Sequence, residues 1–209
     1  MISVQLDTNV ALGRTALAIA WCLAWGEGCK PQYGSHVQAQ MRQAISGKGD
    51  WPNQLREIID QVGWLTSDAL KFPSTLDELK QLIAEHSTLW NSEIGLVYGG
   101  ATKIKQYVFE AAKLPDIRGA SALLDRINLV DIPSFFGHPD GTQSAAEWLE
   151  KNFPDLNPAL IPELLIYFKG GSILAFCPAA FVNNLANAIE KRYTWLTDKT
   201  VSGGRLKPQ

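Results

Sequence analysis

The sequence predicts an α+β fold, with a small all-α region at residues 1–92 followed by a βαββα unit at residues 93–209. Three observations lead to this prediction. In about the first 90 residues, apolar side chains recur at helical spacing. Short apolar runs that end in paired glycines occur only after Glu93. Gly170-Gly171 joins two such runs, as the turn of a β-hairpin does.

Composition excludes several classes of protein. The chain has 209 residues and a formal net charge of -2, so no strong overall field draws it to nucleic acid or to an anionic membrane. Its three cysteines are an odd number without metal-ligand spacing, which is typical of reduced cytosolic residues. The longest apolar run, 16–25, is roughly half of the ~20 residues that a membrane span requires. We expect a cytoplasmic protein with no membrane partner.

Three helices are expected in the first region. Residues 12–25 are apolar on nearly every face and end at Gly26, which predicts a buried helix. Residues 53–62 carry apolar side chains at i, i+3, i+4 and i+7. A third helix begins at Ser74 or Thr75, because Thr75 and Glu78 have capping-box spacing.

The second region begins with a strand and a helix. Residues 94–98 form a short apolar run that ends in Gly99-Gly100, which suits a buried strand leaving its sheet at a sharp turn. A helix is predicted at residues 116–129. A loop with several glycines and prolines follows at residues 131–141.

Three more elements follow the loop. Ser144 and Glu147 have capping-box spacing at the start of a short helix. The hairpin comes next, and Pro178 then opens a helix with one apolar stripe. These are five elements of a ferredoxin-like βαββαβ unit, and residues 202–209 are a poor candidate for the sixth, a strand.

The hairpin tip is where chemistry would be expected. In palm-type polymerases and cyclases, metal-binding carboxylates follow the glycines of such a hairpin. Here Ser172 and Ile173 occupy those positions, and neither replaces an anionic oxygen ligand for Mg²⁺.

Three stretches together resemble one protein family, the large palm-domain subunit of type III CRISPR effector complexes. They are residues 99–110 (GGATKIKQYVFE), residues 114–125 (LPDIRGASALLD) and the Gly170-Gly171 hairpin. The resemblance covers about half the chain, Ile94 to Trp195, and Asp-Ile-Arg-Gly-Ala-Ser-x-Leu-Leu is its most specific part.

The resemblance implies a fold and a function. Members have two palm-like domains, of which the second has a Gly-Gly-Asp-Asp hairpin that makes cyclic oligoadenylates from ATP. The first has a degenerate hairpin and helps to form the ATP pocket, and this chain is similar to that first palm. The implied cofactor is ATP, with Mg²⁺ supplied by the second palm. The implied partners are other type III CRISPR subunits, guide RNA and target RNA.

Many members also carry a metal-dependent HD nuclease at the N-terminus. Such a site needs a His-Asp pair with further ligands to bind metal and activate water. The first region offers only His36 and His86, and Asp follows neither of them. We therefore expect the nuclease to be absent or reduced to a helical remnant, and the chain alone not to be catalytic.

Candidate binding residues follow from the hairpin and from the resemblance. Gly170, Gly171 and Ser172 would contact a nucleotide at the turn, where the alternative is a serine that satisfies its own backbone. Arg118, Gly119, Ala120 and Ser121 would bind phosphate at a helix start, where the alternative is a helix cap with a solvated arginine. Lys103 and Lys105 would touch RNA or a partner, or are solvated surface lysines.

Two other functions stay open. The chain could be a free-standing palm-type nucleotidyl cyclase or transferase, which would need carboxylates from elsewhere in the sequence. It could also be an unrelated nucleotide-binding regulator, since a fold does not determine a function. No metal ligand is expected among Asp116, Asp125 and Asp131. The first two are on different turns of the predicted helix, and nothing brings a second carboxylate to Ser172.

Overall fold

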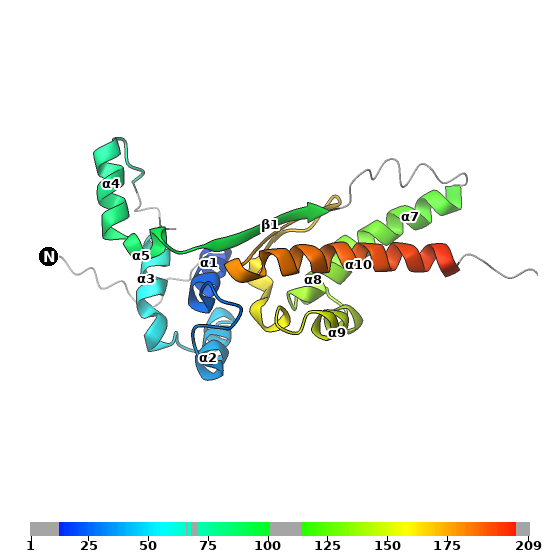
Figure 1. Ribbon diagram of the computed structural model, residues 1–209, viewed down its shortest axis with the longest axis horizontal. Helices are drawn as coiled ribbons and strands as arrows, with labels where there is room; N and C mark the ends of the chain where they lie inside the picture. The colour runs from blue at the N-terminus through cyan, green and yellow to red at the C-terminus, as the bar shows by residue number, and fades with distance from the viewer. Residues whose placement is uncertain (1–12, 66, 68–70, 101–113, 204–209) are drawn as a thin grey trace, which may run out of the picture. The chain divides into compact units, whose positions relative to one another are not determined.

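The computed structural model describes residues 13–65, 67, 71–100 and 114–203 (Figure 1). It confirms the fold class at a coarse level: the protein is α+β and mostly helical, with a small antiparallel sheet of three strands among the described residues. The chain divides into two compact units. The N-terminal unit reaches Gly95 and includes Pro178–Ala180, and the C-terminal unit holds Leu96–Cys177 and the chain from Phe181 onward. Within the described ranges, no helix has the length and apolar character of a membrane span.

Helix α1 (Arg14–Trp25) provides much of the core of the N-terminal unit. Its side chains are apolar on nearly every face, and eight of its twelve residues are buried. Such a helix is stable only when other elements surround it. As predicted, it ends at Gly26, whose φ of 86° favours glycine.

Two further helices complete this part of the core. Helix α3 (Arg56–Leu65) follows a short 3₁₀ turn, η1 (Asn53–Leu55), and packs against α1. Its predicted apolar stripe is confirmed for Leu55, Ile59 and Val62, which are buried. Helix α2 (Ser35–Ile45) was not predicted, because its sequence is largely polar and it buries only Met41.

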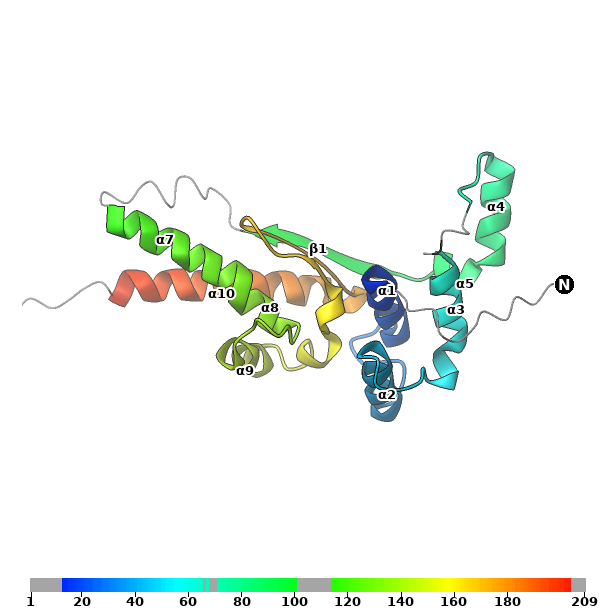
Figure 2. The same ribbon diagram turned by 180° about the vertical axis from the view of Figure 1, so that it is seen from behind.

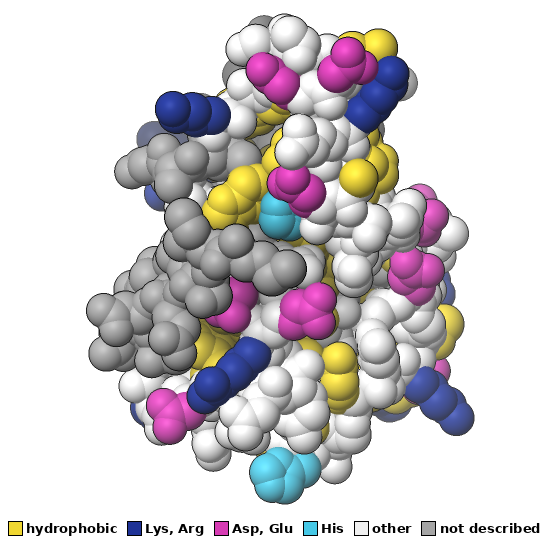
Figure 3. All heavy atoms as spheres, turned by 90° about the vertical axis from the view of Figure 1, so that its left-hand side faces the viewer, with side chains coloured by type: hydrophobic (Ala, Val, Ile, Leu, Met, Phe, Trp, Pro, Cys, Tyr) yellow, Lys and Arg dark blue, Asp and Glu magenta, His cyan; other side chains and the backbone are white. Residues whose placement is uncertain are grey.

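Helix α4 (Leu76–Glu85) confirms the predicted capping box. The Thr75 hydroxyl accepts from the Glu78 N–H at 3.2 Å, and the Glu78 carboxylate accepts from the Thr75 N–H at 3.2 Å. The helix nevertheless buries none of its residues, and the one-turn helix α5 (Ser87–Trp90) follows it. Figure 3 views the side of the molecule on which α4 lies, and hydrophobic side chains are exposed there among charged ones.

The sheet lies in the C-terminal unit, apart from the ends of two strands. Its strands are β1 (Ile94–Gly100), β2 (Leu165–Tyr167) and β3 (Ser172–Pro178), in the order β1-β3-β2. Strands β2 and β3 are antiparallel, with Leu165 opposite Ala175 and Tyr167 opposite Leu174, so the register slips by one residue between these pairs. Strand β3 is therefore central, and β1 and β2 are its neighbours.

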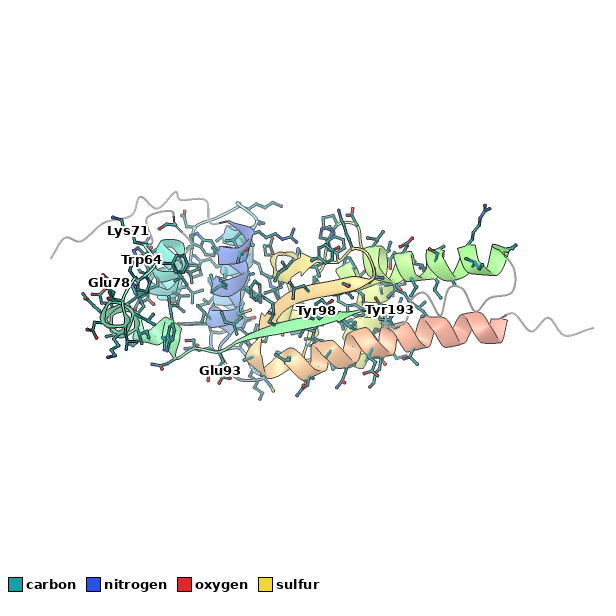
Figure 4. All side chains as sticks on the ribbon, turned by 90° about the horizontal axis from the view of Figure 1, so that it is seen from above. Trp64, Lys71, Glu78, Glu93, Tyr98 and Tyr193 are labelled. Atoms are coloured by element: carbon teal, nitrogen blue, oxygen red, sulfur yellow. The ribbon has the colours of Figure 1, made fainter. Side chains whose placement is uncertain are left out.

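The two faces of the sheet differ in burial. Val97, Ile173 and Ala175 point to one face and are buried against the unit's core. Leu96 and Tyr98 point to the opposite face, where they are 54% and 74% exposed. Figure 4 looks onto this open face, on which Tyr98 is labelled.

A chain of helices lies between β1 and β2. It comprises α7 (Leu114–Arg126), the π-helical turn η2 (Ile127–Asp131), α8 (Ile132–Phe135) and α9 (Gln143–Asn152). Short 3₁₀ turns, η3 (Asn157–Ala159) and η4 (Pro162–Leu164), lead into β2. The loop predicted at residues 131–141 is therefore wrong in its first half. Ile132, Pro133 and Phe135 are buried, and this packing favours a helix where glycines and prolines nearby suggested a loop.

The predicted capping box at Ser144 is also wrong. Helix α9 begins at Gln143, and its N-cap Thr142 makes no side-chain cap hydrogen bond. The Glu147 carboxylate accepts instead from the Gln143 side-chain amide at 2.8 Å. Glu147 therefore binds a side chain four residues before it and does not cap the backbone of the helix start.

Helix α10 (Val182–Gly203) follows the 3₁₀ turn η5 (Ala179–Phe181) and is the longest described helix. The apolar stripe predicted for this part of the chain is confirmed: Phe181, Leu185, Ala188 and Ile189 are all buried. The chain remains helical to Gly203, so the described residues after β3 contain no further strand.

Candidate functional site

The hairpin turn has the geometry that its glycines predict. Gly170 and Gly171 have φ values of 61° and 82°, and the Ser172 N–H donates to the Lys169 carbonyl at 3.1 Å. Two positive φ values in succession define a turn that matches the twist of the flanking strands. Lys169 and Gly170 are exposed, and Ser172 is half-buried. The turn therefore presents a lysine, two glycines and a hydroxyl at the end of the sheet.

The end of β1 meets this turn. A Cβ atom added to Gly100 would overlap the carbonyl oxygen of Gly171 and lie 3.0 Å from the Cα of Ser172. Gly100 also has a φ of 153°, which side chains rarely adopt. Only a glycine allows so close an approach of two backbones. Gly100 of β1 and Gly171 of the hairpin, far apart in the sequence, thus belong to one site.

Two tyrosines border this site and were not among the predicted residues. Tyr98 lies on β1 two residues before Gly100, and Tyr167 lies on β2 opposite Leu174. Tyr98 is 74% exposed and Tyr167 is 47% exposed. The alternation of Leu96, Val97 and Tyr98 placed Tyr98 on one face of a strand, but apolar residues on both faces hid which face would be open.

The residues predicted at a helix start lie elsewhere. Helix α7 is already formed at Leu114, so the backbone N–H groups of Gly119, Ala120 and Ser121 belong to the helix interior. The predicted position of these residues at a helix start is therefore wrong, because the helix begins before them, and their contact with phosphate stays a prediction. Arg118, Gly119 and Ser121 are exposed. Figures 1 and 2 show the first turns of α7 extending beyond the end of the sheet, away from the hairpin turn.

The other predicted contact residues cannot be assigned to this site. Lys103 and Lys105 lie outside the described residues, as does most of the 99–110 stretch. His138 lies in the turn after α8, as expected of a loop residue. Its ring meets Phe168 of the hairpin edge-on, with ring centroids 5.4 Å apart.

The donor set at the hairpin does not fit a divalent metal. Ser172 and Ile173 supply no carboxylate, and hard cations such as Mg²⁺ prefer charged oxygen ligands. Across the described ranges, His, Cys, Asp and Glu side chains form no group of three that could hold a metal ion. The site is therefore suited to hydrogen bonding and to a single positive charge from Lys169.

A second polar region lies between η2 and α10. The Arg192 Nε donates to Asp131 Oδ2 at 3.0 Å, and Arg192 Nη2 forms an ion pair with the same oxygen at 2.8 Å; both side chains are almost fully buried. Arg192 also lies over the rings of Trp148 and Trp195. The other Asp131 oxygen, Oδ1, has no hydrogen-bond partner and faces the Arg126 Nε at 3.8 Å. This pair fixes the π-helical turn to α10.

A neutral pair extends this buried region. The Tyr193 hydroxyl donates to the Asn128 side-chain oxygen at 2.6 Å, and the Asn128 amide donates to the Leu124 carbonyl at 2.8 Å. Burial raises the pKa of the Tyr193 phenol to about 12, although the hydrogen bond to Asn128 acts in the opposite direction. Apart from Asp131 Oδ1, the polar groups named here have internal partners, so the region contributes to stability.

A polar hollow lies in the N-terminal unit, beside the C-terminal end of α1. Glu27, Gln32, Ser92 and Glu93 are among its lining residues, and the Glu93 N–H donates to the Glu27 carboxylate at 3.4 Å. His86 is not part of it; its ring stacks on Trp64, with centroids 4.1 Å apart. His36 is exposed on α2. The described residues thus bring no histidine to this hollow.

Comparison of the chain with protein-family models, with curated proteins and with solved structures gives no match.

Proposed function

We propose that the C-terminal unit is a degenerate palm-like domain that forms one side of an ATP pocket. We further propose that the chain belongs to the large subunit of a type III CRISPR effector complex. One observation carries this proposal: Gly100 lies directly against Gly171 and Ser172. That contact joins two of the three separate stretches on which the family resemblance rests.

The strand order supports the palm-like part of the proposal. The chain runs β1, α7, β2, β3, α10, and the sheet order is β1-β3-β2. In a ferredoxin-like split βαβ arrangement, the third strand likewise lies between the first two. The fourth strand of such a sheet would pair with β1, and the described residues contain none there.

The chemistry of the hairpin supports a binding role without catalysis. The turn offers backbone N–H groups, the Ser172 hydroxyl and the Lys169 ammonium, all of which suit phosphate oxygens. It offers no carboxylate to hold Mg²⁺ or to activate a hydroxyl. Metal-dependent chemistry would therefore be supplied by a second palm domain, and this chain would hold and orient the nucleotide.

The nucleotide part is tested by titrating the purified chain with ATP in a calorimeter. We expect binding that weakens about fivefold to tenfold in Lys169→Ala, because one charge-assisted contact to phosphate is lost. Lys151→Ala is the matched control, since Lys151 is exposed on α9 of the same unit. Absence of ATP binding to the unmodified chain at millimolar concentration would refute the nucleotide part of the proposed function.

The assembly part needs a separate experiment. The chain is co-expressed with the other subunits of a type III complex and a guide RNA, and we expect it to co-purify with them. A chain that stays monomeric in this mixture argues for the unrelated regulator. Formation of cyclic or linear oligoadenylate by the chain alone, with ATP and Mg²⁺ or Mn²⁺, would instead establish the free-standing enzyme.

A further inference from the structure

A row of three side chains crosses the open face of the sheet next to the hairpin turn. Tyr167 of β2 is opposite Leu174 of β3. Because Gly100 lies beside Ser172 and the strands are antiparallel, Tyr98 is brought beside Leu174 from the other side. The row is therefore Tyr98, Leu174, Tyr167, with the two tyrosines largely open to solvent.

We propose that Tyr98 stacks on the base of the bound nucleotide and is the main determinant of base binding. This inference rests on the proposed function, since it assigns a second contact to the same ligand. Exposed aromatic rings on an open sheet face are a common platform for nucleobases, because every base has a face on which a ring can stack. Tyr98 is the most exposed large side chain of this sheet.

The spacing of the row from the turn suits one nucleotide. Tyr98 lies two positions before Gly100, which corresponds to about 7 Å along a strand and is on the scale of one nucleoside. Phosphates held at Lys169, Gly170 and Ser172 would thus leave the base over Tyr98. The Tyr167 hydroxyl lies 3.5 Å from the position of a Cβ on Gly170, so this second tyrosine is directed toward the turn.

Charge favours a mononucleotide over an RNA strand. None of the three strands contains a Lys, Arg, Asp or Glu, and Lys169 is the one charged residue of the turn between β2 and β3. An RNA backbone that crossed the face would leave its successive phosphates unmatched there, because each needs a positive partner to release its counterions. A single lysine at one end of the row matches a ligand whose charge is concentrated at one end, as in ATP.

The test compares ATP affinities of single variants at one salt concentration. Tyr98→Leu is expected to weaken ATP binding about tenfold, and Tyr98→Phe less than about threefold, because the phenyl ring still stacks. Phe72→Leu is the control, since Phe72 is an aromatic side chain exposed in the N-terminal unit. Chemical unfolding of each variant checks that the fold is retained, as expected for so exposed a residue.

A second measurement reports stacking directly. In Tyr98→Trp, we expect ATP to quench the indole fluorescence more than ribose triphosphate, which lacks a base, does. If the unmodified chain binds no ATP, the proposed function fails and this inference fails with it. If the chain binds ATP, but Tyr98→Leu binds equally well or ATP causes no extra quenching, only the role of Tyr98 is refuted. Tighter binding of a short oligoadenylate RNA than of ATP, lost in Tyr98→Leu, would refute the choice of a mononucleotide.

Discussion

At the contact between η2 and α10, Asp131 and Arg192 are almost fully enclosed, whereas at the hairpin tip Lys169 and Gly170 are exposed to solvent. Both regions are polar, and both belong to the C-terminal unit. In the first, Arg192 binds Asp131 across 61 positions of sequence, and the Tyr193 hydroxyl binds Asn128 across 65. In the second, the turn uses one internal hydrogen bond and leaves its charge unpaired among the described interactions.

This difference in burial indicates that the first region stabilises the fold and that the second can bind a ligand. Buried charges cost free energy unless they are paired, so the groups of a buried pair are committed to each other and enclosed away from a ligand. An exposed turn costs little when its polar groups remain in water, and those groups can later exchange water for phosphate. We therefore expect substitutions at the first region to change the stability of the fold, and substitutions at the second to change binding.

The largest effect is expected at the buried ion pair. Arg192→Met leaves the Asp131 carboxylate buried without its main partner, and we expect a loss of about 3 kcal/mol in the free energy of unfolding. Urea denaturation measures it. Lys191→Met is the control, because Lys191 is the exposed neighbour on the same helix. Recovery of most of the loss in an Asp131→Leu, Arg192→Met double variant would attribute the effect to the unpaired carboxylate, and a loss below about 1 kcal/mol would contradict it.

The next effect tests whether β1 and the hairpin form one site. Gly100→Ala places a methyl group against the Gly171 carbonyl and strains a φ of 153°, so we expect a loss of about 2 kcal/mol. Gly99→Ala is a matched control, since a Cβ on Gly99 meets nothing within 4 Å. Thermal unfolding of both variants distinguishes them. Equal stabilities would mean that the close approach of Gly100 to the turn does not exist in solution.

A smaller effect is expected within the turn itself. Gly170→Ala forces a side chain into a φ of 61°, which costs about 1 kcal/mol. Gly170→Asn should cost less, because asparagine tolerates this conformation in two-residue hairpin turns. Denaturation midpoints of the two variants give the comparison. If alanine proved as stable as asparagine, the turn would have another conformation.

The smallest effect concerns alkaline pH. The folded-state pKa of Tyr193 is raised from 10.0 to about 12, so the folded state holds the phenolic proton more tightly than the unfolded state does. The resulting stabilisation is complete below about pH 10 and is lost as the pH rises toward 12. We expect Tyr193→Phe to remove this part of the decline in stability. Phenolate absorbance provides the direct measurement, and a Tyr193 that ionises with the exposed tyrosines would refute the raised pKa.

Local features of the fold could be predicted because a few neighbouring residues fix them. The Thr75–Glu78 capping box and the Gly170-Gly171 turn each form within four residues, and both are confirmed. The apolar stripe on α10 could also be predicted, because its residues recur at helical spacing on one face. Where packing overruled local signals, the predictions were wrong. The chain after Asp131 is helical because its apolar side chains are buried, and α7 begins before the residues that were expected to start it.

The candidate site divides in the same way. The sequence alone determined the α+β class, the glycine turn and the lack of carboxylates at Ser172 and Ile173, because residue type and short spacing decide them. Only the tertiary structure decided that Gly100 meets Gly171, that Tyr98 lies on the open face, and that Arg192 pairs with Asp131. Each of these depends on segments that are distant in sequence and are brought together by burial of the core, and no local pattern encodes which segments will meet.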